Sequence, residues 1–332
     1  MSEEQNKIVD RNSEILFLYD AKQCNPNGDM DNENKPRMDW QAGRNLVSDV
    51  RLKRYVRDYL HIVKKEHIFV RKLGDEALKA EEAIALFKCL KEGKKESDLT
   101  RKDLDISNKE LQKLGDDFFE MKDIRLFGAT IPFAVETDGQ KGSSSTFTGP
   151  VQFNWGYSLN RIEELQESRT ITSHLRTGKS EQGAGIGKDY RVNYSFIAFS
   201  GGINANTAKS TKMTWEDVNL LDEAMIKSIP LNRTRSKIGQ TPRLYLRVES
   251  SDNQTVLNDL REFISLDTKV DEASLRSIHE CTLKAEDLRS YLDKNSSKIE
   301  KVHYWKDDSL AIEGLSFDGN DLFEEISLNE DK

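Results

Sequence analysis

The chain has 332 residues, with 50 Lys plus Arg against 58 Asp plus Glu and a formal net charge of −8. Its length and its 14 Phe, 9 Tyr and 4 Trp provide a hydrophobic core for one large or two modest domains, which excludes a wholly disordered chain. No run approaches the ~20 apolar residues of a membrane span, the start MSEEQNKIVDRNSE has no apolar signal segment, and three distant cysteines fit a reducing cytoplasm.

The first part of the chain predicts a strand, a long loop and a helix. Residues 14–22 (EILFLYDAK) predict a buried strand that ends at the turn sequence NPNGD, 25–29. Residues 23–45 are rich in Asn, Asp, Gly and Pro and predict a loop. Residues 46–63 predict a helix capped by Ser48, with basic side chains opposite one apolar stripe. The stripe comprises Leu46, Val50, Leu52, Val56, Tyr59 and Leu60.

The middle of the chain predicts an insertion and further strands. Residues 75–122 are highly charged and predict a helical lobe outside the core. Residues 123–136 predict a strand, a turn and a second strand, and residues 151–160 alternate like a strand. Residues 169–190 are polar, basic and Gly-rich, which predicts a hairpin or a loop.

The last part of the chain completes an α+β pattern. Strands are predicted at 191–203 and 242–249, a helix with Thr214 as its cap at 214–229, and a further helix near 283–294. Without the insertions, the order is βαββαβ, which is the order of the ferredoxin-like fold that RRM-type RNA binders share. This fold alone does not determine a function.

The charge is divided unevenly along the chain. Residues 35–72 hold 11 basic and 4 acidic side chains, and residues 168–248 hold 13 basic and 6 acidic ones. Residues 307–332 hold nine acids and one Lys, and we expect this acidic tail to be flexible. Each basic segment taken alone is typical of a solvated face, whereas two that fold together would make one electropositive groove.

Catalytic and cofactor motifs are weak. The sequence has no HExxH and no GxSxG, and its GK[ST] at 178–180 lacks the upstream glycine of a P-loop, so we expect no cofactor and no bound metal. Asp29 and Asp31 lie in the loop before the basic helix. They leave open an alternative function, a metal-dependent ribonuclease that cuts RNA with a loop Asp.

The basic helix and the loop before it favour nucleic-acid binding. Guanidinium groups contact phosphate in a bidentate way, and a helix start with its cap Ser48 accepts an anion. Gly28 allows a backbone to approach closely at the turn. Such contacts hold a nucleic-acid backbone and carry no sequence information. The donors are Arg37, Arg44, Arg51, Lys53, Arg54 and Arg57.

Six motifs occur together in chain order and resemble one protein family. The resemblance is to the CRISPR-associated backbone subunit family of type I Cascade surveillance complexes, and in particular to its type I-B branch. It runs from residue 14 to about residue 249. The motifs are NPNGD (25–29), KPRMD (35–39), RNLVSDVRLKRYVRDY (44–59), DIRLFGA (123–129), GPVQF (149–153) and TRSKIGQTPRLYLRVE (234–249).

The resemblance implies a non-enzymatic, repeating subunit in the cytoplasm. It implies an RRM-like palm (14–61, 123–168 and 191–300), a helical finger (75–122) and a hairpin thumb (169–190). Its partners would be the guide CRISPR RNA, the target DNA through the guide, other copies of the chain and other Cascade subunits, without a membrane. The residues it places at the RNA are Asn27, Gly28, Ser48, Lys53, Arg54 and Arg57, then Gln152, Arg176, Lys179, Lys188, Arg235 and Lys237.

A third alternative is a ferredoxin-like scaffold that binds only protein. Co-purified nucleic acid would exclude it, and Asp-dependent cleavage of RNA with Mg²⁺ would favour the ribonuclease.

Overall fold

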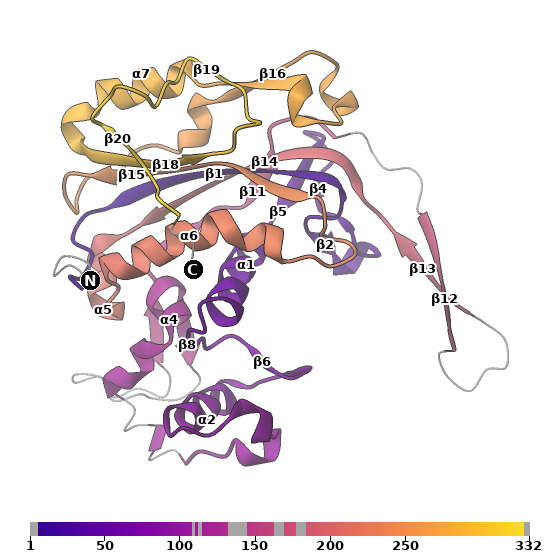
Figure 1. Ribbon diagram of the computed structural model, residues 1–332, viewed down its shortest axis with the longest axis vertical. Helices are drawn as coiled ribbons and strands as arrows, with labels where there is room; N and C mark the ends of the chain where they lie inside the picture. The colour runs from indigo at the N-terminus through magenta and orange to yellow at the C-terminus, as the bar shows by residue number, and fades with distance from the viewer. Residues whose placement is uncertain are drawn as a thin grey trace.

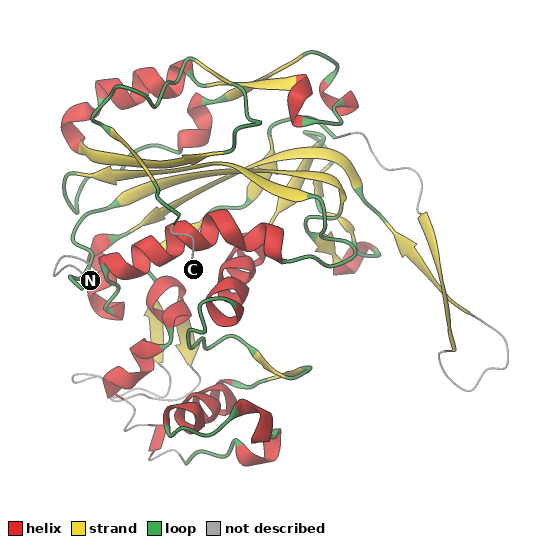
Figure 2. Cartoon of the chain, in the orientation of Figure 1, coloured by secondary structure: helices red, strands yellow, loops and turns green. Residues whose placement is uncertain are grey.

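The computed structural model describes residues 6–107, 110–111, 115–131, 145–162, 169–176 and 184–328. The protein belongs to the α+β class, and a large mixed sheet crosses its middle (Figures 1 and 2). The strand order is β20-β18-β15-β1-β14-β11-β5-β4, and β10 also pairs with β14. Their bounds are β1 Ser13–Cys24, β4 Met38–Asp39, β5 Arg44–Val47, β10 Val151–Phe153, β11 Gly156–Ser158, β14 Val192–Ile203, β15 Gln240–Ser250, β18 Ile299–Lys306 and β20 Phe323–Glu325.

The centre of the sheet is antiparallel and buried on both faces. Strand β1 lies between β14 and β15, with Phe17 opposite Phe199 and Tyr245. Its side chains from Ile15 to Tyr19 are all fully buried, which explains the continuous apolar run in this segment. The four main strands occur in the chain in the order β1, β11, β14 and β15. In the sheet their order is β15-β1-β14-β11.

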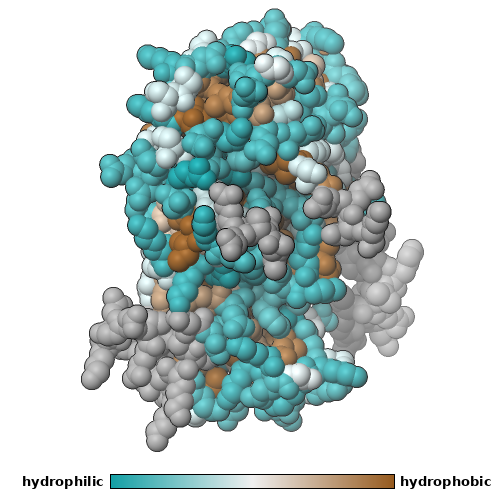
Figure 3. Space-filling model, turned by 60° about the vertical axis from the view of Figure 1, so that its left-hand side comes forward, coloured by the Kyte–Doolittle hydropathy of each residue, from teal (hydrophilic) through white to brown (hydrophobic). Residues whose placement is uncertain are grey.

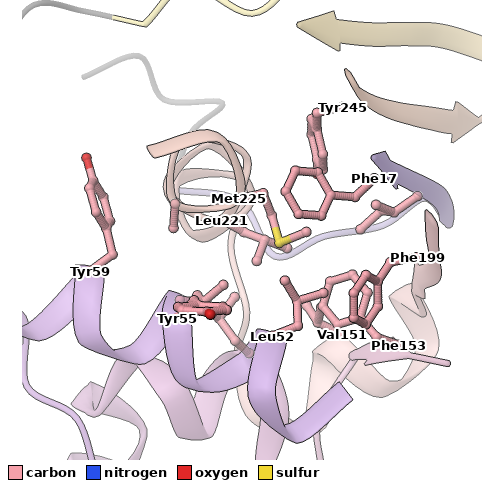
Figure 4. Packing of buried hydrophobic residues seen from close by; sticks show 14 of the residues in the cluster. Phe17, Leu52, Tyr55, Tyr59, Val151, Phe153, Phe199, Leu221, Met225 and Tyr245 are labelled. Atoms are coloured by element: carbon pink, nitrogen blue, oxygen red, sulfur yellow. The ribbon is translucent and has the colours of Figure 1, made fainter. Parts of the chain in front are cut away.

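Two helices cover one face of the sheet (Figure 4). Helix α1, Asp49–Ile62, directs Leu52 and Tyr55 toward Leu221 and Met225 of α6, Trp215–Leu231. The predicted helix is confirmed, but part of its stripe is wrong. Val50 is 65% exposed, and Leu46 belongs to β5, because the chain enters the helix only after the cap Ser48.

The other face of the sheet carries a second apolar layer. It contains β16 Ser265–Thr268, β17 Cys281–Lys284, α7 Glu286–Lys294 and β19 Ile312–Glu313. The expectation of a flexible acidic tail is wrong for residues 307–328. Leu310, Leu315 and Phe323 are buried in this layer, and β20 pairs with β18 in parallel, because apolar residues are interspersed among the acids.

A lobe lies below the two helices (Figure 1). Its helix α2, Ala80–Lys91, packs with Phe118 and Ile124 in a separate core. The strand–turn–strand prediction for 123–136 is wrong at its start, since Lys122–Phe127 forms the helix α4 and only Gly128–Ile131 forms a strand, β8. The other elements of this region are β6 Lys72–Leu73, β7 Glu76–Ala77 and β9 Ser145–Thr148, which pairs with β8.

A two-stranded ribbon projects from the body of the molecule (Figure 1). It consists of β12, Arg169–Arg176, and β13, Ala184–Asp189, in antiparallel register. Among the described residues, no helix is long and apolar enough to cross a membrane. The face drawn in Figure 3 is mostly hydrophilic, with small separated hydrophobic patches. The remaining elements are β2 Gly28–Asp29, β3 Lys35–Pro36 and α5 Ala205–Thr211, and the 3-10 helices Met30–Asn32, Glu96–Asp98, Arg101–Asp103, Gly115–Glu120, Leu260–Phe263, Glu272–Ser274, Ile278–Glu280 and Ser296–Lys298.

Candidate nucleic-acid interface

The start of α1 is tied to the turn that follows β1. Ser48 is the N-cap of the helix, and its Oγ accepts a hydrogen bond from the Arg51 amide. The same hydroxyl donates to Asn27 Oδ1 at 3.0 Å, and the Ser48 amide donates to that oxygen at 2.9 Å. The two predicted residues Asn27 and Ser48 therefore act as one unit that fixes the loop against the first turn of the helix.

The turn itself leaves no space for a side chain at Gly28. A Cβ built on Gly28 would lie 2.0 Å from Asn34 Oδ1, so another residue would displace the Asn34 side chain. The loop also positions Arg37, whose Nη2 lies 3.2 Å from Asp29 Oδ1 and whose guanidinium carbon lies 5.9 Å from the centre of the half-exposed Trp155 ring. The Arg37 amide donates to the Asn27 carbonyl oxygen at 3.0 Å, so Arg37 lies beside the Asn27–Ser48 unit.

Lys53 and Gln152 meet one turn further along the helix. Lys53 Nζ donates to Gln152 Oε1 at 2.9 Å and lies 3.2 Å from Asp49 Oδ2. The amide of Gln152 donates to the carbonyl oxygen of Gly149. The amine of Lys53 and the side-chain amide of Gln152 therefore lie together beside the start of the helix, although the two residues are far apart in the sequence.

The second basic segment folds against the same loop. Lys237 Nζ donates to the carbonyl oxygens of Asn25 and Pro26, at 2.6 and 3.1 Å. Arg235 lies 3.3 Å from Asp189 at the end of the ribbon, and its side chain is 56% exposed. The two basic segments also contact each other, since Arg51 of the first donates to the Asn232 side chain of the second, as the groove interpretation requires.

The base of the ribbon contributes Lys188. Its Nζ lies 3.0 Å from Glu33 Oε1, and the Tyr190 hydroxyl donates to Glu33 Oε2 at 2.7 Å. The Tyr190 hydroxyl and Lys188 hold the pKa of Glu33 below its usual value, and Glu33 raises the pKa of Lys188. Both side chains of the ion pair are about half exposed, so the attraction between them is weak.

Three predicted basic residues contact other parts of the molecule. Arg44 donates to the carbonyl oxygen of Ser158 and pairs with Glu272. Arg54 pairs with Asp58 and donates to the Val70 carbonyl. Arg57 Nε lies 3.0 Å from Oδ2 of the buried Asp123, and the Arg57 side chain is only 12% exposed. A role in RNA binding stays a prediction for all three.

The thumb residues are only partly described. Arg176 is the last residue of β12. Lys179 lies outside the described residues. For these two positions the predicted contact with RNA stays a prediction.

Arg191 is a residue that the sequence reasoning missed. Its guanidinium donates to the carbonyl oxygens of Gln23 and Arg235 and to the Asp189 carboxylate, at 3.0, 3.1 and 2.8 Å. It joins the end of β1, the ribbon and the loop before β15. The sequence feature that could have identified Arg191 is its position between a Gly-rich basic segment and a strongly predicted strand.

We call the shared surface of these segments the cationic surface. Its basic groups suit an anionic polymer such as a nucleic-acid backbone, because each supplies charge-assisted donors to phosphate. Carboxylates neutralise most of these groups in the isolated chain. The cationic surface comprises Asn27, Gly28, Arg37, Ser48, Arg51, Lys53, Gln152, Lys188, Arg191, Arg235 and Lys237.

The two loop carboxylates, of Asp29 and Asp31, have different surroundings. Asp29 is held by Arg37, and Asp31 lies exposed in a short 3-10 helix. Within the described ranges, no group of three or more His, Cys, Asp or Glu side chains is arranged to hold a metal ion.

A family model and a curated relative show the same family. Residues 11–286 match the family model described as CRISPR-associated protein Cas7. A protein of Haloferax volcanii named CRISPR-associated protein Cas7 is 32% identical over 316 residues, which cover 91% of this chain and 88% of that protein. Two solved structures also align at 13% identity. One, titled CRISPR RNA-guided surveillance complex, pre-nicking, covers 95% of both chains with a TM-score of 0.49. The other, titled CRISPR RNA-guided surveillance complex, covers 89% of this chain and 88% of that one with a TM-score of 0.46.

Proposed function

Because this chain belongs to the Cas7 family of CRISPR-associated proteins, we propose that it is a repeating, non-catalytic backbone subunit of a type I Cascade surveillance complex of the type I-B branch. It binds the guide CRISPR RNA along its phosphate backbone and assembles with further copies of itself and with other Cascade subunits. The guide, rather than the protein, reads the target DNA by base pairing, as in another RNA-guided effector.

The observation that carries this proposal is the convergence of three distant segments on the cationic surface. Asn27 contacts Ser48, Lys53 contacts Gln152, and Lys237 contacts the carbonyl oxygen of Asn25. The segments contribute backbone-gripping groups rather than a pocket shaped for one base. Such a surface supports recognition of RNA by its backbone, independent of sequence.

We assign the parts of the molecule accordingly. The sheet with α1 and α6 is the RRM-like palm, supported by the strand order β15-β1-β14-β11. The lobe around α2 is the finger, and the ribbon β12/β13, whose base carries Lys188 on the cationic surface, is the thumb.

The first test is to purify the chain from its native host and to sequence the small RNA bound to it. Repeat-spacer RNA is expected. A double variant, Lys53→Ala with Gln152→Ala, should lose most of this RNA while it keeps its circular dichroism spectrum. A preparation that carries no RNA, or random RNA only, contradicts the proposal.

The ribonuclease alternative needs a separate measurement. The protein is incubated with single-stranded target RNA and Mg²⁺, alongside the variants Asp29→Asn and Asp31→Asn. We expect intact RNA in every reaction. Cleavage that is lost in either variant would replace the binding-only function with the enzymatic one.

A further inference from the structure

Arg51 and Lys237 differ from the other basic residues of the cationic surface. Arg37, Lys53, Lys188 and Arg235 each have a carboxylate within 3.3 Å. Arg51 instead donates to the Asn232 side chain and lies over the Tyr55 ring, with its guanidinium carbon 4.1 Å from the ring centre. Lys237 contacts only the two carbonyl oxygens of the loop. Neither cation has a carboxylate within ion-pair distance among the described residues.

The same short loop holds the two cations near each other. Lys237 Nζ contacts Asn25 and Pro26, and the next residue, Asn27, is bonded to the helix cap Ser48. The amide of Arg51 donates to that same cap. Both residues are partly exposed in the structure. Arg51 lies in the first turn of a 14-residue helix, where backbone amides also favour an anion, and Lys237 contacts the loop that is bonded to the cap of this helix.

The charge of this pair is uncompensated. Burial, together with the positive charge of Arg51, lowers the pKa of Lys237 to about 8. Arg51 Nε is buried without an acceptor among the described residues. Two neighbouring cations without a counter-ion are unfavourable in a partly buried site, and such arrangements concentrate at functional sites.

The other titratable groups around Lys237 do not supply the missing charge. Burial raises the pKa of the Cys24 thiol to about 12, and it also raises the pKa of Tyr55. Both groups are therefore neutral near pH 8. The Gln240 amide, which donates to the Lys237 carbonyl, carries no charge.

We propose that Arg51 and Lys237 form a preformed subsite for one phosphate group, occupied by a phosphodiester of the bound RNA. This inference rests on the proposed function and specifies where the backbone is anchored. A phosphate that binds Arg51 and Lys237 has no carboxylate to displace. At the four other basic residues it must displace one, namely at Arg37, Lys53, Lys188 and Arg235.

The test measures RNA binding by fluorescence anisotropy at about pH 7 and about pH 9, where the bases of an adenine-only oligonucleotide do not titrate. For the full-length protein, we expect the affinity to fall about tenfold across this range, because the charged fraction of Lys237 falls by about that factor. Lys237→Arg, whose charge does not titrate, should remove most of this pH dependence. Lys209→Ala, an exposed charge change on α5, should leave it unchanged.

The first test relies on Lys237→Arg, whose larger side chain has to fit at this position. A second measurement does not need this variant. Calorimetric titration with the same RNA, at about pH 8.5 in buffers of different ionisation enthalpy, counts protons taken up on binding. The native protein and Lys209→Ala should take up most of one proton, and Lys237→Met should take up none.

The outcomes separate the two proposals. If the native protein binds no RNA, the proposed function fails. If it binds RNA with no pH dependence, or if Lys237→Met still takes up the proton, the subsite is wrong while the function stands. Inorganic phosphate alone is a further arm. If phosphate binding at low millimolar concentration is accompanied by uptake of this proton, while RNA binding is not, the subsite serves free phosphate. That result overturns the inference.

Discussion

At the scale of single residues, what a basic side chain contacts decides what it does. Arg57 and Lys53 lie on the same helix and their side chains are each 12% exposed, yet Arg57 pairs with the buried Asp123 whereas Lys53 donates to the exposed Gln152. Asp123 also accepts hydrogen bonds from the amides of Phe69 and Val70. Arg57 therefore joins the helix to the lobe, a role that its spacing in the sequence does not reveal.

Asp123→Ala is expected to destabilise the protein by about 3 kcal/mol, since it leaves the Arg57 guanidinium and the amides of Phe69 and Val70 without their buried acceptor. Urea unfolding measures the loss. The matched control is Asp58→Ala, which removes the partly exposed i,i+4 partner of Arg54 and should cost less than about 1 kcal/mol. Equal losses in the two variants would contradict the buried role of Asp123.

At the scale of elements, the start of α1 joins stability and binding. The cap hydroxyl of Ser48 satisfies a helix amide and holds Asn27 at the same time. The helix α6 has a cap of the same kind, in which Thr214 and Asp217 bond each other's amide groups. This second cap lies away from the cationic surface, so the two caps can be compared directly.

Ser48→Ala and Thr214→Ala are each expected to cost about 1 kcal/mol of stability. Only Ser48→Ala should also weaken RNA binding. It removes the hydroxyl that holds Asn27, and with it the support for the loop that Lys237 contacts. Thermal unfolding and anisotropy titrations of both variants check this. An equal loss of RNA affinity in Thr214→Ala would mean that the effect comes from reduced stability alone.

The sequence predicts the long elements well and the short or composite ones poorly. The buried run of β1 and the capped, amphipathic α1 carry strong local patterns and are confirmed. The helix α4 has only six residues, too few for a helical period to stand out in KDIRLF. The contacts of Lys53 with Gln152 and of Lys237 with Asn25 depend on the tertiary fold, which no local pattern encodes.

At the scale of the whole molecule, carboxylates compensate much of the cationic surface before any ligand binds. Asp29, Asp49, Asp189 and Glu33 each neutralise a basic group there. The net charge of −8 therefore reflects both distant acids and acids within the surface itself. A bound phosphate competes with these acids as well as with salt ions.

Asp29→Asn is expected to strengthen RNA binding, because it frees Arg37. It should also steepen the dependence of log affinity on log salt concentration by about 0.7, the value for one more phosphate contact with a single strand. Asp287→Asn on α7, which makes the same change in net charge on the other layer, should leave the slope unchanged. A shift of equal size in both variants would show that only net charge matters.

The C-terminal segment contributes to the fold of the whole chain. Phe323 packs in the second apolar layer with Tyr304 and Phe317. Phe323→Ala is expected to lower the free energy of unfolding by about 3 kcal/mol. Val256→Ala, at a position that is 73% exposed, is the control and should change it by less than about 0.5 kcal/mol. A negligible effect of Phe323→Ala in urea unfolding would restore the view of this segment as a free tail.

The parallel pairing of β20 with β18 also protects one edge of the sheet from pairing with a strand of another chain. The unpaired edge of β18 would otherwise offer its amides and carbonyls to any passing strand. Three residues of β20 cover the middle of that edge, and Glu324 and Glu325 are exposed there. A strand of only three residues with two exposed charges is a poor template for further pairing. The sheet therefore ends within each molecule, and the chain is protected from edge-to-edge aggregation at this side.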